Sequence, residues 1–164
     1  MCIRDRTATA AIAEMVRQVG EPVFAAPDGT QLFAAQMNDA CEEADEDAEF
    51  LMKKGVIVRH LALPGQEADS KRVLSYLLKT YGERIYISLM NQYTPMLQLT
   101  SHSGNQKELE EAAQQEPQLM RKVTAREYEQ VVDYALQLGI TNAFIQEGDV
   151  AKESFIPDFD TTGV

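Results

Sequence analysis

The sequence is poor in cysteine, and this excludes two classes of protein. Cys2 and Cys41 are the only cysteines among the 164 residues, and they lie far apart. A disulfide framework needs several cysteines, and a thiolate metal site needs closely spaced ones, so this chain alone can build neither. Cys41 is interpreted as an ordinary helix residue, and no metal ligand is assigned.

Long apolar runs and an excess of basic residues are also missing. No stretch approaches the roughly 20 apolar residues that span a bilayer, and the N-terminus lacks the apolar centre of a signal peptide. We therefore expect a soluble, cytoplasmic protein without a membrane partner. Asp and Glu total 26 against 15 Lys and Arg, for a net charge of −11. Binding to a phosphate backbone needs a basic surface, so no nucleic-acid partner is expected.

The length predicts one domain, and it also suits a piece of a larger one. Residues 1–6 (MCIRDR) carry no periodicity and join abruptly to a helical pattern. They are interpreted as a non-native, adapter-derived leader, which leaves residues 7–164 as the domain and places the true start of the gene upstream.

The stretch at residues 55–65 (GVIVRHLALPG) organises the chain. Its β-branched run predicts a parallel strand covered on both faces, and Pro64 and Gly65 end it. Arg59 and His60 interrupt the run, and a buried cation is costly unless it is paired or faces a ligand. Arg59 is thus the first functional candidate. The alternative is an arginine that extends to the sheet edge or pairs with a structural carboxylate.

Helices are expected on both sides of this strand. Apolar spacing predicts a helix at residues 7–19, and Asp69 or Ser70 can begin another that stops at Gly82. Thr124 and Glu127 form a capping box that begins a third, which ends near residue 139. Residues 21–35 carry turn signals, and residues 36–54 have helical character. The acidic cluster within them lacks the glycine and closing glutamate of a calcium loop, so a solvated helix or loop is favoured.

Two further strands are predicted at residues 84–90 and 140–145, and the helices between the strands imply parallel pairing through right-handed crossovers. Ligands bind outside the carboxyl ends of parallel strands. The side chains expected there offer a guanidinium, amides, a phenol and a carboxylate, which suit a zwitterionic or ribose-bearing ligand. They are Arg59, His60 and Asp69; Asn91, Gln92 and Tyr93; and Gln146 and Glu147. No catalytic triad, phosphate loop or metal-ligand spacing accompanies them.

Five stretches together resemble the C-terminal half of radical SAM iron-sulfur proteins related to the pyruvate formate-lyase activating enzyme. They are residues 55–65, 69–74 (DSKRVL), 86–95 (YISLMNQYTP), 126–135 and 144–148 (FIQEG). The resemblance covers about residues 7–164, and the region at 22–54 is longer and more acidic than in that family. It implies an α/β fold, the C-terminal part of a partial (β/α) barrel with parallel strands and flanking helices.

The same resemblance implies S-adenosylmethionine and a 4Fe-4S cluster as cofactors of the full-length family. The cluster, held by a Cys-x-x-x-Cys-x-x-Cys loop, reductively cleaves S-adenosylmethionine to a 5′-deoxyadenosyl radical. The radical then abstracts a hydrogen atom from a small molecule or from a protein substrate such as a glycyl-radical enzyme. This chain lacks the cysteine loop, so we expect a fragment. Whether it is itself an enzyme stays open, and no catalytic residue is assigned.

Residue by residue, the resemblance implies a cofactor-binding set. Arg59 is similar to the arginine that lies beside S-adenosylmethionine, and Leu61 is expected on the adenine side. Asn91, Gln92 and Tyr93 are expected near the adenosine or the substrate mouth. The alternative to an enzyme fragment is a non-catalytic α/β binding or interaction module that needs no iron. A half-barrel exposes a strand edge and apolar surface, so the isolated fragment is expected to aggregate or swap strands.

Overall fold

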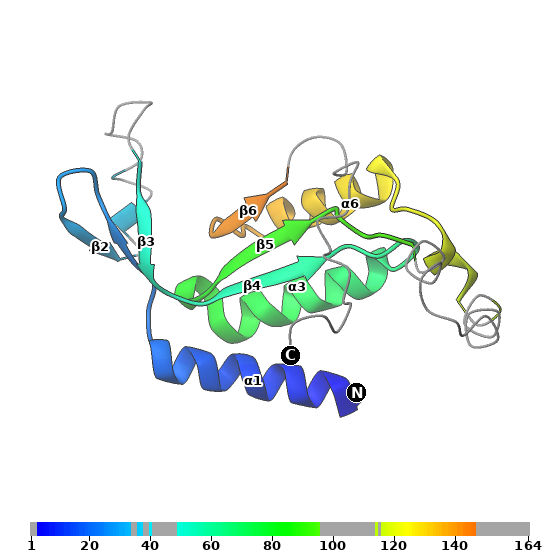
Figure 1. Ribbon diagram of the computed structural model, residues 1–164, viewed down its shortest axis with the longest axis horizontal. Coiled ribbons are helices and arrows are strands. Elements are labelled where there is room, and N and C mark those ends of the chain that lie inside the picture. Colours follow the sequence, from blue (N-terminus) through cyan, green and yellow to red (C-terminus); the bar gives the residue numbers. More distant parts are fainter. Residues whose placement is uncertain are drawn as a thin grey trace, which may run out of the picture.

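The computed structural model describes residues 3–33, 36–37, 40, 49–95, 114 and 116–146. They form a mixed α/β fold with a parallel sheet flanked by helices and a small antiparallel sheet at one end (Figure 1). The helices and strands are, in chain order, α1 (Ile3–Val19), β1 (Val23–Ala25), β2 (Gln31–Phe33), β3 (Leu51–Lys54), β4 (Ile57–Leu61), α3 (Glu67–Tyr81), η1 (Gly82–Arg84), β5 (Tyr86–Met90), η3 (Pro117–Met120), α6 (Ala125–Gln137) and β6 (Ala143–Ile145).

The parallel sheet has the order β4-β5-β6, so each strand pairs with the next strand of the sheet along the chain. α3 links β4 to β5, and α6 lies between β5 and β6 in the chain. In the register, Arg59 pairs with Ser88, and Ser88 pairs with Phe144. The three predicted parallel strands are confirmed, with ends that are shorter by one to three residues.

The helices pack on one face of this sheet, which we call the helix face. Leu74 of α3 and Val131 of α6 are almost completely buried against Ile87 and Leu89 of β5, and Val16 of α1 joins the same core. Figure 1 shows α1 and α3 running side by side below the sheet in that view. Each side chain buried in this way contributes about 1.5 to 3 kcal/mol to the stability of the fold.

The opposite face of the parallel sheet, here called the open face, is not covered by any described helix. Ile57, Leu61 and Phe144 lie on it with exposed fractions of 45%, 37% and 48%. The predicted coverage of the first strand on both faces is therefore wrong. Side chains alternate between the faces of a strand, so helices on one side cover only Val58 and His60 of β4.

The small sheet has the order β2-β1-β3 and is antiparallel. Asp28 and Gly29 form the predicted turn between β1 and β2, with Gly29 at a φ of 87°. The strands themselves were not predicted, and the expected helical character of residues 51–54 is wrong because β3 occupies them. Strands of three or four residues are too short to show a clear alternation, which explains the difference.

The helix ends agree with the prediction in some places and differ in others. α6 begins with the predicted capping box, in which Thr124 and Glu127 bind each other's backbone N–H. α3 begins earlier than predicted, after Gln66, so neither Asp69 nor Ser70 caps it. α1 already includes Ile3 to Arg6, which carry no periodicity and were interpreted as part of a non-native leader.

Several predictions fall on residues outside the described part. They concern Cys2, Cys41, Glu147 and all of the acidic cluster except Glu49. Among the residues that are described, no helix has both the length and the apolar character that a membrane crossing needs.

Candidate functional site

The first predicted residue, Arg59, lies on the open face of the parallel sheet. Its Nε donates a hydrogen bond to the Met90 sulfur at 3.1 Å. Within residues 3–33, 49–95 and 116–146, no carboxylate forms an ion pair with Arg59, so the expected alternative of a structural ion pair is not seen there. The guanidinium has further N–H donors, which it presents to whatever covers this face.

Arg59 has apolar neighbours on the same face. Ile57 and Leu61 flank it along β4, and Leu61 pairs in register with Met90 of β5. Arg59 and both of these neighbours are exposed to solvent. Arg59 and Leu61 thus lie on the same face of β4, and their role in binding stays a prediction.

Three aromatic rings cross the same face near the small sheet. Phe24 of β1 packs against Tyr86 of β5 at 5.2 Å between ring centroids, and Tyr86 packs against Phe144 of β6 at 5.4 Å. Tyr86 is 8% exposed and Phe144 48% exposed, so the outermost ring of the three is the accessible one. Sequence reasoning missed Phe144 as a site residue, because only the strand register places it in line with Arg59.

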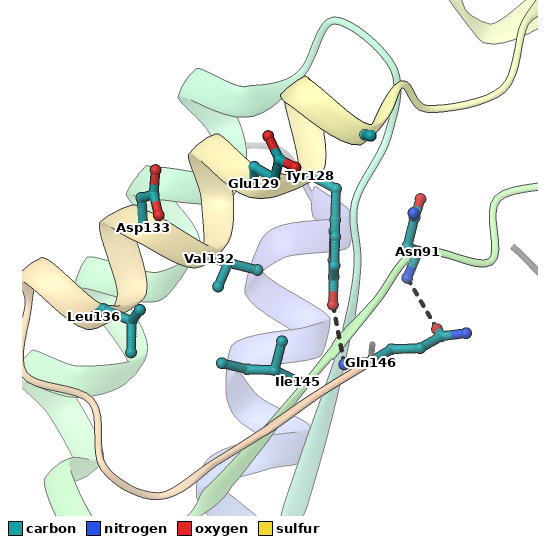
Figure 2. Close-up of a pocket in the computed structure, with 9 residues that line it drawn as sticks. Asn91, Tyr128, Glu129, Val132, Asp133, Leu136, Ile145 and Gln146 are labelled. Carbon is teal, nitrogen blue, oxygen red and sulfur yellow. Dashed lines mark hydrogen bonds between the residues drawn. The ribbon is translucent and has the colours of Figure 1, made fainter. Parts of the chain in front are cut away.

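Asn91, Tyr128 and Gln146 form a second cluster, at the carboxyl ends of β5 and β6 (Figure 2). The Asn91 backbone N–H donates to Gln146 Oε1 at 3.2 Å, and the Gln146 N–H donates to the Tyr128 hydroxyl oxygen at 3.1 Å. The Tyr128 hydroxyl in turn donates to the Leu89 carbonyl at 3.0 Å, and burial raises the pKa of this phenol. These bonds hold α6 against both strand ends. Asn91 and Gln146 are thus brought together as predicted.

A cavity of about 480 Å³ lies beside this cluster. Figure 2 shows α6 along one side of it, with Glu129 and Asp133 one turn apart and Val132 and Leu136 nearer to Ile145. Asn91 also lines the cavity, is 7% exposed, and has an Oδ1 atom without a hydrogen-bond partner among the described residues. Because α6 packs on the helix face, this cavity is separate from the face that carries Arg59.

The remaining predicted residues lie in other places. Gln92 is exposed, and the Tyr93 hydroxyl donates to the Leu119 carbonyl at 2.7 Å, which ties the chain after β5 to η3. His60 points to the helix face, so it does not join Arg59. Its Nε2 is buried without a partner in the described part of the chain. Burial lowers the pKa of His60, and the Asp69 carboxylate offsets part of this effect.

The loop after β4 is fixed by Glu127 of α6. Its carboxylate accepts hydrogen bonds from the Gly65 N–H at 2.9 Å and from the Thr124 N–H at 2.8 Å. Arg121 Nη1 donates to Glu127 Oε2 at 2.7 Å. The Arg121 guanidinium, together with these N–H donors, holds the pKa of Glu127 far below its usual range. Gly65 has a φ of 71°, a backbone conformation that L side chains rarely adopt, so a substitution there is strained.

The described residues fit one of the two implied cofactors and not the other. A 4Fe-4S cluster needs several thiolates, and no group of three or more His, Cys, Asp or Glu side chains that could hold a metal occurs in the described part. These residues therefore do not fit the cluster. An arginine and an exposed aromatic ring on one face do fit a ligand that carries both a carboxylate and a purine.

The hydroxyl groups that hydrogen-bond to carboxylates in the described part, Thr30 with Asp28 and Thr124 with Glu127, lie outside both the open face and the cavity beside α6. The open face offers one fixed cation among apolar groups, and the cavity beside α6 offers two carboxylates above an apolar floor. Comparison with protein-family models, with curated proteins and with solved structures finds no match for this chain.

Proposed function

We propose that this chain is the C-terminal part of a radical SAM barrel, and that the open face of its parallel sheet is the side on which S-adenosylmethionine binds. In such an enzyme a reduced 4Fe-4S cluster would supply the electron that splits S-adenosylmethionine into methionine and a 5′-deoxyadenosyl radical. The cluster ligands are expected in another part of the full-length protein, since the described residues do not supply them.

One observation carries this proposal. Three parallel strands follow each other in chain order, the helices that connect them pack on one face, and Arg59 lies on the other. A (β/α) barrel has this arrangement, with helices outside and a strand-lined interior. Parallel sheets are normally covered on both faces, so an apolar open face with Ile57, Leu61 and Phe144 favours a sheet that continues around an interior.

The roles of the chain's own residues follow from their positions. Arg59 binds the carboxylate or ribose oxygens of S-adenosylmethionine with two parallel N–H donors. Leu61 adds an apolar wall to the same face and excludes water from the ion pair. Gln92 follows β5 and is exposed, so it is proposed to border the mouth through which a substrate enters, whereas Asn91 faces the cavity beside α6 and Tyr93 is bonded to η3.

The partner of this activity is proposed to be a glycyl-radical enzyme or a small molecule, in the cytoplasm. The net charge of −11 favours a partner with a basic or neutral surface over an acidic one. The same charge disfavours nucleic acid.

The proposal is tested by binding of S-adenosylhomocysteine, which keeps the carboxylate and the adenosine but is chemically stable. Titration calorimetry on the full chain should give saturable binding, and Arg59→Ala should weaken it about 10-fold or more, as expected for a lost charge-assisted bond. Arg126→Ala, an exposed arginine on α6, is the matched control and should bind like the wild type. Failure of the wild type to bind would refute the proposal.

A second candidate is a non-catalytic binding module that needs no iron. The observation in its favour is the cavity beside α6, where Glu129 and Asp133 lie above Val132 and Leu136. A monodisperse chain that unfolds cooperatively and does not bind S-adenosylhomocysteine would support the module over the enzyme fragment.

A further inference from the structure

Arg59, Ser88 and Phe144 form a straight row across the open face. Arg59 of β4 pairs in register with Ser88 of β5, and Ser88 pairs with Phe144 of β6. Because neighbouring strands lie about 4.8 Å apart, the two ends of the row are separated by about 10 Å. A cation, a hydroxyl and an aromatic ring thus lie in one line at the spacing of the strands.

The ring of Phe144 is held in place and is also accessible. It packs against Tyr86 with a centroid distance of 5.4 Å and an interplanar angle of 31°. Tyr86 is itself backed by Phe24 at 5.2 Å, so two rings behind Phe144 limit its movement. Phe144 nevertheless keeps 48% of its surface exposed. A flat ring that is supported from one side and exposed on the other can stack on a planar group.

We propose that Phe144 stacks on the purine of an adenosine-bearing ligand whose acidic group is bound by Arg59. The Ser88 hydroxyl lies between them and is placed to bind the ribose. This inference rests on the proposed function and deepens it. The family resemblance implied that the adenine lies near Leu61 on β4, whereas the inference places the purine at Phe144 on β6, on the other side of the sheet.

The chemistry of the row selects the class of ligand. Stacking on an aromatic ring needs a flat π-system, which every nucleobase has, and it does not need a particular hydrogen-bond pattern. The guanidinium needs an anion, and it binds a carboxylate with two donors. A purine nucleoside that carries an acidic tail satisfies both ends, whereas adenosine alone satisfies only the ring.

Binding of two probes to the full chain tests this inference. The probes are adenosine, which lacks the acidic tail, and S-adenosylhomocysteine, which carries it. Phe144→Leu should weaken both by about 10-fold, since it removes the flat ring but keeps an apolar side chain. Phe144→Tyr should restore binding to within about 2-fold, because it restores the ring. Arg59→Ala should weaken S-adenosylhomocysteine but leave adenosine unchanged.

A matched control distinguishes the loss of stacking at Phe144 from the effect of replacing any exposed phenylalanine by leucine. Phe33 of β2 is 51% exposed and lies in the small sheet, so Phe33→Leu should not affect either probe. If Arg59→Ala weakens S-adenosylhomocysteine while Phe144→Leu binds both probes normally, the Phe144 inference is wrong and the proposed function stands. If the wild type binds neither probe, both are wrong.

Discussion

Replacement of Glu127 by alanine tests whether one carboxylate joins the loop after β4 to α6. The side chain is only 12% exposed and accepts hydrogen bonds from the Gly65 N–H, from Thr124 and from Arg121. Glu127→Ala removes these bonds together, and it leaves the half-buried Gly65 N–H without an acceptor.

The size of the loss follows from the separate contacts. A hydrogen bond from a half-buried N–H to a carboxylate contributes about 1.5 kcal/mol, and the reciprocal cap with Thr124 about 1 kcal/mol. The Arg121 side chain is 44% exposed, so its ion pair with Glu127 adds only a little to this sum. Glu127→Ala should therefore lower the free energy of unfolding by about 3 kcal/mol.

Urea unfolding followed by circular dichroism measures this loss. With a urea dependence of about 2 kcal/mol per molar, the midpoint should fall by about 1.5 M. Thr124→Ala, which removes only part of the cap, should lower it by about 0.5 M. If the two variants lose the same stability, the bonds from Glu127 to Gly65 and Arg121 contribute nothing, and the reasoning is refuted.

The same carboxylate predicts a dependence on pH. The pKa of Glu127 is lower in the folded chain than the ordinary glutamate value of about 4.3. The folded state thus binds fewer protons, and the stabilisation is complete above the ordinary value and is lost as the pH falls below it. Glu127→Gln should make unfolding less sensitive to acid in this range.

Two further predictions concern the core and His60. Leu74 is completely buried in α3, so Leu74→Ala should cost about 3 kcal/mol in urea unfolding, and a loss below about 1 kcal/mol would contradict the packing described. Burial lowers the pKa of His60, so the folded state binds fewer protons than the unfolded state. The stability of the fold is therefore not reduced by this histidine above about pH 6.5, and it decreases as the pH falls below that value. Unfolding between pH 5 and 7.5 should show this slope, and His60→Gln should reduce it; a slope unchanged by the substitution would disprove the assignment to His60.

The elements of the parallel sheet could be predicted because their signals are local. The capping box of Thr124 and Glu127 and the glycines at residues 82 and 139, both with positive φ, mark helix ends within a few residues. The run before Arg59 marks a strand in the same way. Long strands and helices carry enough residues for a period to be read, whereas β1 and β2 have three residues each.

What the sequence could not provide is the direction in which strand-end residues point. Arg59 and Asn91 both belong to the predicted carboxyl-end rim, but Arg59 lies on the open face and Asn91 lines the cavity beside α6. The face of a strand residue depends on which side the helices pack, and this is a property of the whole sheet. Phe144 was missed for a related reason, since its alignment with Arg59 depends on the register of two strand pairs.

The chain-order arrangement β4-β5-β6 also has a consequence for folding. β4 pairs with β5 across a single helix, α3, so the stretch of chain that must close between them is short. β5 pairs with β6 across a longer stretch that includes η3 and α6. Short loop closure costs less entropy and speeds folding. During synthesis, β4, α3 and β5 can associate before α6 and β6 leave the ribosome, and each later unit then adds to an existing edge.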